Sequence, residues 1–120
     1  MNIWEIEMNS LIKTALFGFV FALATPLWAQ NIEFRDRVTL SVGQSAVIHG
    51  ARGDCGKAPE KAQVALPALK TGTLSLGKAG VRNSNSCGGP TPAIEVIFTA
   101  TSVGRESFDL FGDRVSVRVK

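Results

Sequence analysis

Alternation of apolar and polar residues constrains this chain more than any other feature of its sequence. The last seven residues alternate without a break, with Val115, Val117 and Val119 between polar neighbours. Shorter stretches of the same pattern occur earlier, and glycine or proline separates them. Successive side chains of a β-strand point to opposite faces, so this period favours strands with one buried side and one solvent-facing side. We therefore expect an all-β domain after residue 30.

The spacing of these stretches predicts an antiparallel β-sandwich or a small barrel of six to seven short strands, about 8–12 residues apart. The expected strands are residues 38–42, 46–49, 62–69, 71–76, 93–101, 106–111 and 114–120. Pro67 would make the third an edge strand or an interrupted one. Residues 52–58 and 77–92 are predicted loops, because they are rich in Gly, Asn, Ser and Pro. No linker divides residues 30–120, so we predict one domain.

A short apolar run precedes this domain. Residues 15–27 (ALFGFVFALATPL) follow Lys13, and Ala29 is a small residue at a plausible cleavage site. A helix of this length is too short to cross ~30 Å of hydrocarbon, but it fits the middle of a secretory signal. We predict a cleaved signal helix over residues 1–29, with Met8 as an alternative start because the first seven residues are acidic. The expected location is the periplasm or the extracellular space, with no membrane span; the alternative is a buried core helix.

The chain has two cysteines, Cys55 and Cys87, and both lie in the predicted exported part. Two cysteines in an oxidising compartment most often pair, so we predict a structural disulfide. A redox pair is disfavoured because there is no CxxC motif. One histidine and two cysteines cannot supply four zinc ligands without carboxylates. We predict neither a metal nor a cofactor.

Aromatic composition limits the possible functions. Residues 30–120 contain four Phe but no Trp or Tyr, which disfavours sugar platforms and the base stacking used by nucleic-acid-binding proteins. His49 is the sole histidine, no G-x-S-x-G motif exists, and we expect His49 to be a partly exposed turn residue. Glu95 and Asp109 are expected as solvated charges on outer strand faces. We therefore predict no catalytic residues and no enzymatic activity.

Two segments resemble a known class of module. The run Phe98-Thr-Ala-Thr-Ser-Val-Gly-Arg-Glu-Ser-Phe108, followed by Gly112 and a Val-x-Val-x-Val strand, resembles the C-terminal half of bacterial immunoglobulin-like or cadherin-like modules. Lys70-Thr-Gly-Thr-Leu74 is similar to their earlier K-x-G-T-L turn. The resemblance implies an antiparallel, immunoglobulin-like β-sandwich and a binding role at the cell envelope or surface. The chain lacks the acidic D-x-D runs of cadherin-like modules, so no calcium ligands are carried over.

Charge indicates where binding could occur. Residues 30–120 carry 12 Lys and Arg against 8 Asp and Glu, a net charge of +4. Alternation places Arg114, Arg118 and Lys120 on one outward face of the last strand, with Arg105 near the preceding turn. Such a face could bind an anionic envelope polymer. The alternative is a solvated face that protects an edge strand from aggregation.

The leading hypothesis is a small exported binding or adhesion-type module that acts on an unknown protein or an envelope component. The second is a periplasmic inhibitor or immunity-type protein whose Gly77–Pro92 loop enters a target cleft. Arg82, Asn83 and Asn85 would then lie at the tip of that loop. The alternative for the loop is a solvated connection that Cys87 ties down.

Overall fold

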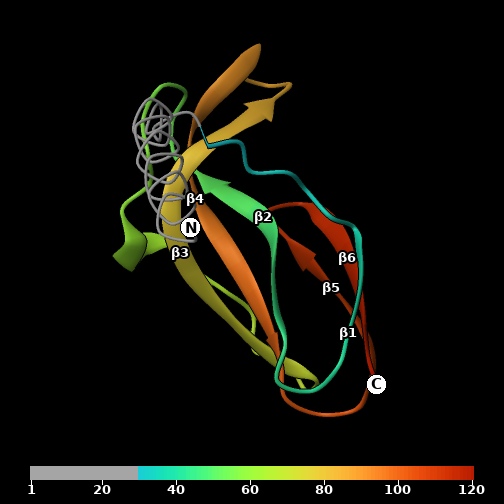
Figure 1. Cartoon of the computed structure of the whole chain (residues 1–120). Helices are drawn as coiled ribbons and strands as arrows, with labels where there is room; N and C mark the ends of the chain where they lie inside the picture. The colour runs from blue at the N-terminus through green and yellow to red at the C-terminus, as the bar shows by residue number, and fades with distance from the viewer. Residues whose placement is uncertain (1–29) are drawn as a thin grey trace, which may run out of the picture.

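The computed structural model describes residues 30–120, which form two three-stranded β-sheets packed against each other (Figure 1). One sheet has the strand order β1-β6-β5 and the other β2-β4-β3. The strands are β1 (Arg37–Leu40), β2 (Ser45–Arg52), β3 (Gly72–Ser84), β4 (Gly89–Ala100), β5 (Gly104–Leu110) and β6 (Asp113–Val119). The predicted all-β sandwich of six to seven strands is confirmed, with six strands in residues 30–120. The predicted signal peptide and the Met8 start lie outside the described residues.

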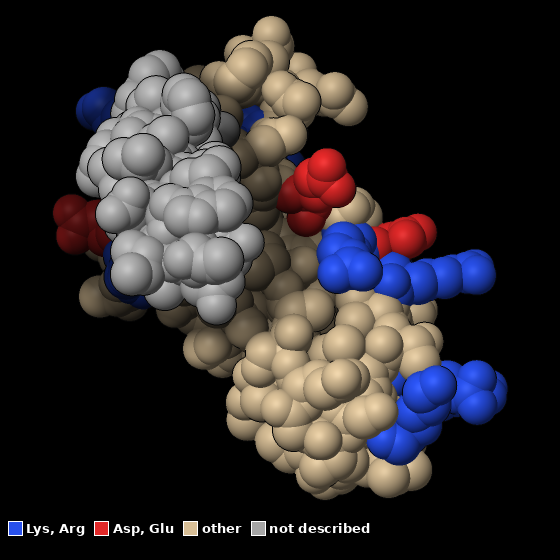
Figure 2. Space-filling view, viewed as in Figure 1, with Lys and Arg blue, Asp and Glu red and all other residues tan. Residues whose placement is uncertain are grey.

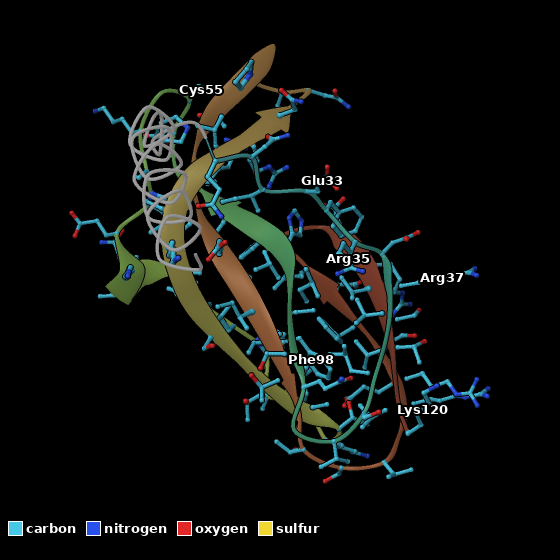
Figure 3. The ribbon with its side chains drawn as sticks, in the orientation of Figure 1. Glu33, Arg35, Arg37, Cys55, Phe98 and Lys120 are labelled. Carbon is cyan, nitrogen blue, oxygen red and sulfur yellow. A yellow bond between two sulfur atoms is a disulfide. The ribbon has the colours of Figure 1, made fainter. Side chains whose placement is uncertain are left out.

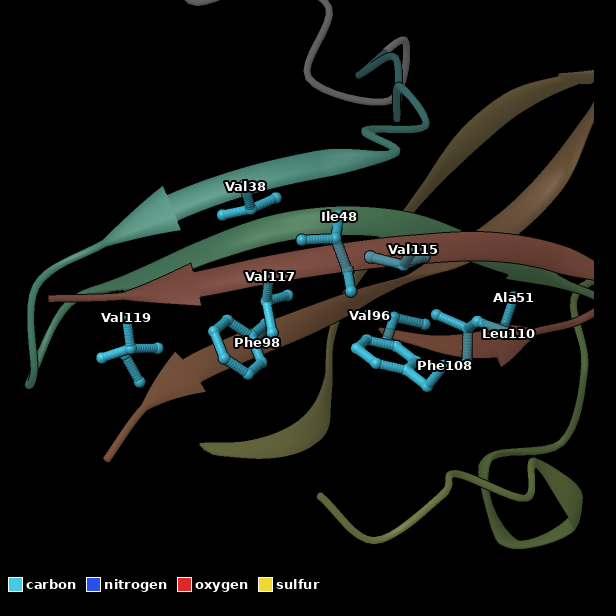
Figure 4. Packing of buried hydrophobic residues seen from close by; sticks show 11 residues of the cluster. Val38, Ile48, Ala51, Val96, Phe98, Phe108, Leu110, Val115, Val117 and Val119 are labelled. Atoms are coloured by element: carbon cyan, nitrogen blue, oxygen red, sulfur yellow. The ribbon is translucent and has the colours of Figure 1, made fainter. Parts of the chain in front are cut away.

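The core consists of the inward-facing side chains of both sheets (Figure 4). β6 contributes Val115, Val117 and Val119, each at most 3% exposed, as its alternation predicts. Phe98 of β4 is fully buried opposite them. Each sheet thus covers the apolar side of the other, which is the packing that defines a sandwich.

One strand pair departs from the antiparallel expectation. β1 runs parallel to β6, with Val38 beside Val117 and Leu40 beside Val119. The other pairs, β5–β6, β2–β4 and β3–β4, are antiparallel. Parallel neighbours need a long connection, and here the connection between β1 and β6 contains all the other strands, β2 to β5.

The predicted loop Gly77–Pro92 is wrong, because this stretch is a β-hairpin. β3 continues to Ser84, β4 begins at Gly89, and the connecting turn is short. Glycine here allows close approach of neighbouring groups instead of breaking the strand. A Cβ on Gly77 would lie 2.7 Å from a Glu95 oxygen, and a Cβ on Gly80 would lie 2.8 Å from the Gln30 carbonyl oxygen. The hairpin end projects beyond β2 in Figure 1.

Two further expectations are wrong, one about a strand and one about the exposure of a carboxylate. Residues 62–69 form no strand; a short 3₁₀ helix, η2 (Lys61–Gln63), is followed by an irregular segment. Val64 and Leu66 are half-buried against the core, so their alternating pattern arises from burial of these side chains although the segment pairs with no strand. Glu95 is only 8% exposed instead of solvated, and it accepts hydrogen bonds from the Lys78 amide at 2.9 Å and the Gln30 side chain at 3.4 Å.

The predicted disulfide is confirmed. Cys55 lies in the loop after β2, and Cys87 lies in the turn of the β3–β4 hairpin, with their Cα atoms 5.5 Å apart. The Cys55 label in Figure 3 marks this end of the molecule. The bond joins the hairpin end to the loop that follows β2.

Candidate functional site

The outward side of the β1-β6-β5 sheet is rich in arginine. We call it the basic face, and it carries Arg37, Arg105, Arg114, Arg118 and Lys120, all exposed. Figure 2 shows Lys and Arg side chains along one side of the molecule, and Figure 3 places Arg37 and Lys120 on that side. The face includes the four basic residues that alternation predicted for the last strand and the turn before it.

Strand register brings like charges together at the centre of the basic face. Arg105 of β5 lies directly opposite Arg118 of β6, and Thr39 of β1 lies on the other side of Arg118. Two like charges in directly opposed positions destabilise a sheet unless an ion of opposite sign compensates them. Within the described residues, neither arginine has a carboxylate within ion-pair distance.

A shallow groove runs between these arginines. Hydroxyl groups alternate with the charges along it, since Ser107 and Ser116 face each other across β5 and β6 with their oxygens 2.9 Å apart. Arg37 lies beside Ser116 on the β1 side. Guanidinium groups interleaved with hydroxyls can bind carboxylate, sulfate or phosphate groups.

The other predicted residues of the face are less central. Arg114 forms an ion pair with Asp109, which is exposed as predicted, at 3.6 Å, and both side chains are about two-thirds exposed. Such a pair contributes little to stability. The edge-protection alternative is wrong for β6, because β6 is the middle strand of its sheet. We did not predict Arg37 as part of this face, although Arg37 and Thr39 flank Val38 in an alternating pattern.

The predicted tip residues lie on the β3–β4 hairpin, away from the basic face. Arg82 is half-buried, and its Nη1 donates a hydrogen bond to the Gly50 carbonyl oxygen at 2.8 Å. Asn83 and Asn85 are exposed, Asn83 near the end of β3 and Asn85 in the turn. The seven predicted binding residues therefore belong to two separate places.

His49 is not the partly exposed turn residue that we expected. It lies within β2 and is 1% exposed. A β-bulge between Val47 and His49 interrupts the pairing of β2 with β4 and breaks the alternation, so the consecutive residues Ile48 and His49 are both buried. Bulges that redirect a side chain are frequent beside functional sites, yet no local sequence signal marks this one.

Both ring nitrogens of His49 are hydrogen-bonded. The Gly50 amide donates to Nδ1 at 2.8 Å, and Nε2 lies 2.9 Å from Asp113 Oδ2. Because Nδ1 accepts, the proton of the neutral ring is on Nε2 and is donated to Asp113. Burial lowers the pKa of His49, and the Arg82 charge lowers it further; the Asp113 hydrogen bond and charge oppose this without reversing it.

Glu106 joins the two sheets near the start of β3. Its Oε1 accepts hydrogen bonds from the Lys70 amide at 2.8 Å, the Thr71 amide at 2.6 Å and the Thr71 hydroxyl. Burial alone would raise the pKa of Glu106, but these hydrogen bonds and the Lys70 charge outweigh burial, and the pKa lies below its ordinary value. This contact is structural, because three hydrogen bonds to Oε1 join β5 to the segment that precedes β3.

Comparisons with protein-family models, with curated proteins and with solved structures found no match for this chain. Over residues 30–120, no group of three or more His, Cys, Asp and Glu side chains is placed to hold a metal ion. The same residues include no helix long and apolar enough to span a membrane.

Proposed function

We propose that this protein is an exported, non-enzymatic binding module whose basic face binds an acidic polymer of the cell envelope. The Cys55–Cys87 disulfide supports export, because such bonds persist in oxidising compartments such as the periplasm and the extracellular space. The short apolar run at the start of the sequence supports it independently.

The juxtaposition of Arg105 and Arg118 carries this proposal. An opposed pair of arginines is unfavourable in the free protein, and an acidic ligand would convert this repulsion into attraction. Arg37 adds a third charge beside the same groove. A polymer with regularly repeated carboxylate or sulfate groups can contact several of these arginines at once, which raises its avidity above that of a single anion.

The environment of His49 supports a non-enzymatic role. It is the sole histidine of the chain, and both of its ring nitrogens already have partners inside the protein. A histidine acts as a general base only when a ring nitrogen can reach the proton that it removes.

Binding of fluorescein-labelled polygalacturonate and of heparin, followed by fluorescence anisotropy, tests the proposal. The triple variant Arg37→Gln, Arg105→Gln and Arg118→Gln should bind at least about tenfold more weakly, and wild-type affinity should fall as salt rises from about 50 to 200 mM. The matched control removes three exposed lysines elsewhere and changes net charge equally: Lys57→Gln, Lys61→Gln and Lys78→Gln. Equal weakening in both triple variants would show attraction to net charge alone and would refute a specific face.

The projecting hairpin favours one second candidate, an inhibitor or immunity-type protein. The hairpin is paired along its length and joined to a neighbouring loop by the disulfide, so it can enter a cleft with little loss of conformational freedom. Its exposed end carries Asn83 and Asn85. Under this hypothesis, the variant Asn83→Ala with Asn85→Ala should lose a partner captured from envelope extract, and the basic-face triple variant should retain it. Undiminished capture by the asparagine variant would reject the inhibitor hypothesis.

A further inference from the structure

Two phenylalanines lie on the surface, and both contact His49. Phe34 is 44% exposed and Phe111 is 43% exposed, whereas the other two Phe of the described chain, Phe98 and Phe108, are buried in the core. The ring centroids of Phe34 and His49 are 4.6 Å apart, and those of Phe111 and His49 are 5.4 Å apart. Exposed aromatic rings that gather at one place are characteristic of contact surfaces.

The backbone of Phe111 is strained. Its φ is +54°, and it is the sole non-glycine residue with positive φ among residues 30–120. Phe111 and Gly112, whose φ is +87°, form the turn between β5 and β6. Asn or Gly is the usual residue at the first of these positions, because a bulky side chain disfavours the left-handed conformation. Residues with strained backbone of this kind cluster at functional sites.

A polar hollow of about 430 Å³ adjoins the Phe111 ring. Its lining consists of Arg52, Arg82, Ser84, Asn85, Ser86, Phe111 and Asp113. Two guanidinium groups and one carboxylate leave a local charge of +1, which a ligand with one negative charge would neutralise.

Internal hydrogen bonds hold both arginines. Arg82 donates to the Gly50 carbonyl oxygen at 2.8 Å, and Arg52 donates to the Gly53 carbonyl oxygen at 2.9 Å and to the Ser86 hydroxyl at 3.1 Å. A guanidinium has five N–H donors, so each arginine retains donors for a ligand. Within the described residues, neither has a carboxylate within 4.0 Å, although Asp113 lines the same hollow.

Asp113 supplies an acceptor at the edge of the hollow. Its Oδ2 accepts the His49 hydrogen bond, and its Oδ1 accepts none from residues 30–120. Its side chain is 46% exposed, so a ligand can reach it. The neutral, buried His49 thus orients a carboxylate that can accept one hydrogen bond from a ligand N–H.

We propose that this hollow binds the C-terminal end of a peptide chain. The terminal carboxylate pairs with Arg52 and Arg82, the last peptide N–H donates to Asp113, and the last side chain packs on Phe111. A peptide C-terminus carries one negative charge, one adjacent N–H donor and one side chain, which matches the three kinds of group around the hollow. The site lies apart from the basic face and does not depend on the function proposed for that face.

The test is fluorescence anisotropy with the oxidised protein and fluorescein-labelled Gly-Ser-Ala-Leu, made with a free C-terminal carboxylate and with a C-terminal amide. We expect the free acid to bind and the amide to bind at least about tenfold more weakly, because charge-assisted hydrogen bonds are lost. Equal binding of the two peptides, or binding of neither, would overturn the proposal.

Two variants locate the site. Arg52→Gln should weaken binding of the free acid at least about tenfold. The matched control Lys78→Gln removes one positive charge from an exposed position outside the hollow and should leave binding unchanged. Phe111→Asn places a residue that tolerates the left-handed turn, so the fold should persist and the affinity should fall about fivefold or more. ¹⁵N–¹H NMR spectra confirm that each variant is folded. Wild-type affinity in both Arg52→Gln and Phe111→Asn would place the peptide elsewhere and reject the assignment.

Discussion

Removal of the Cys55–Cys87 disulfide should lower the stability of the domain substantially without changing its fold. The cysteines are 32 residues apart in sequence, and the chain-entropy relation gives about 3.5–4 kcal/mol at 25 °C for a loop of this length. This is a large share of the roughly 5–15 kcal/mol typical of a small domain. The double variant Cys55→Ser with Cys87→Ser is the appropriate perturbation.

The fold should persist because the bridge lies outside the core. Neither cysteine belongs to the buried cluster formed by the two sheets. Two hydrogen bonds still join the same segments after the bridge is removed: Gly56 N–H to Thr91 Oγ1 at 2.9 Å, and Arg52 to Ser86 at 3.1 Å. The variant should therefore retain the β-sheet circular dichroism of the oxidised protein.

Urea unfolding monitored by far-ultraviolet circular dichroism measures the difference, since residues 30–120 contain no Trp or Tyr for intrinsic fluorescence. With a slope of about 1–1.5 kcal/mol per molar, the midpoint should fall by about 2.3–4 M. Wild-type protein reduced with dithiothreitol serves as the control and should match the serine variant. A shift below about 0.5 M would refute the loop-entropy reasoning, and an unfolded variant in the absence of urea would refute the independence of the core.

Three further substitutions and conditions test the contacts described above. Glu106→Gln should cost about 1–2 kcal/mol in urea unfolding, because the acceptor of the Thr71 hydrogen bonds loses its charge while remaining partly exposed. Because the pKa of Glu106 is lowered, the contribution of its carboxylate to the free energy of unfolding is complete above the unfolded-state pKa and is lost as pH falls through the folded-state pKa. If the free energy of unfolding of Glu106→Gln depended on acid pH as that of wild type does, this reasoning would be contradicted. The pKa of His49 is also lowered, so the contribution of His49 to the free energy of unfolding is complete above its unfolded-state pKa and decreases as pH falls below that value. NMR titration of the ring should give a folded-state pKa below that of a model peptide. A higher pKa would contradict burial of the neutral form. Gly72→Ala should cost about 3 kcal/mol or more in thermal unfolding, because a Cβ at this position would overlap the Thr99 carbonyl oxygen and the Phe98 ring of the neighbouring strand β4. An unchanged melting temperature would show that β3 and β4 do not approach so closely here.

Local sequence patterns located most of the strands correctly. Alternation around Val117 predicted both the strand and its buried side. The same reasoning placed Arg114 and Arg118 on one outward face, with Arg105 near the preceding turn. The pattern was misleading at residues 62–69, where apolar residues alternate but the backbone has no partner strand. It was misleading again at residues 77–92, where glycine and asparagine occur in paired strands.

The candidate sites depended more strongly on long-range pairing. Arg37 joins the basic face only because β1 pairs in parallel with β6, a choice that alternation does not encode. The hollow beside Phe111 brings together the end of β2, the β3–β4 hairpin and the β5–β6 turn. Phe111, a large apolar residue directly before Gly112, is the one local signal that could have indicated it.

By itself, the sequence determined the all-β class, the buried face of the last strand and the cysteine pair, because side-chain period and cysteine content are local properties. Only the tertiary structure decided that His49 is buried, since a bulge between β2 and β4 redirects it. Only the tertiary structure opposed Arg105 to Arg118 and placed Asp113 and Arg82 in the lining of one hollow, because strand register and sheet packing depend on residues far apart in the chain.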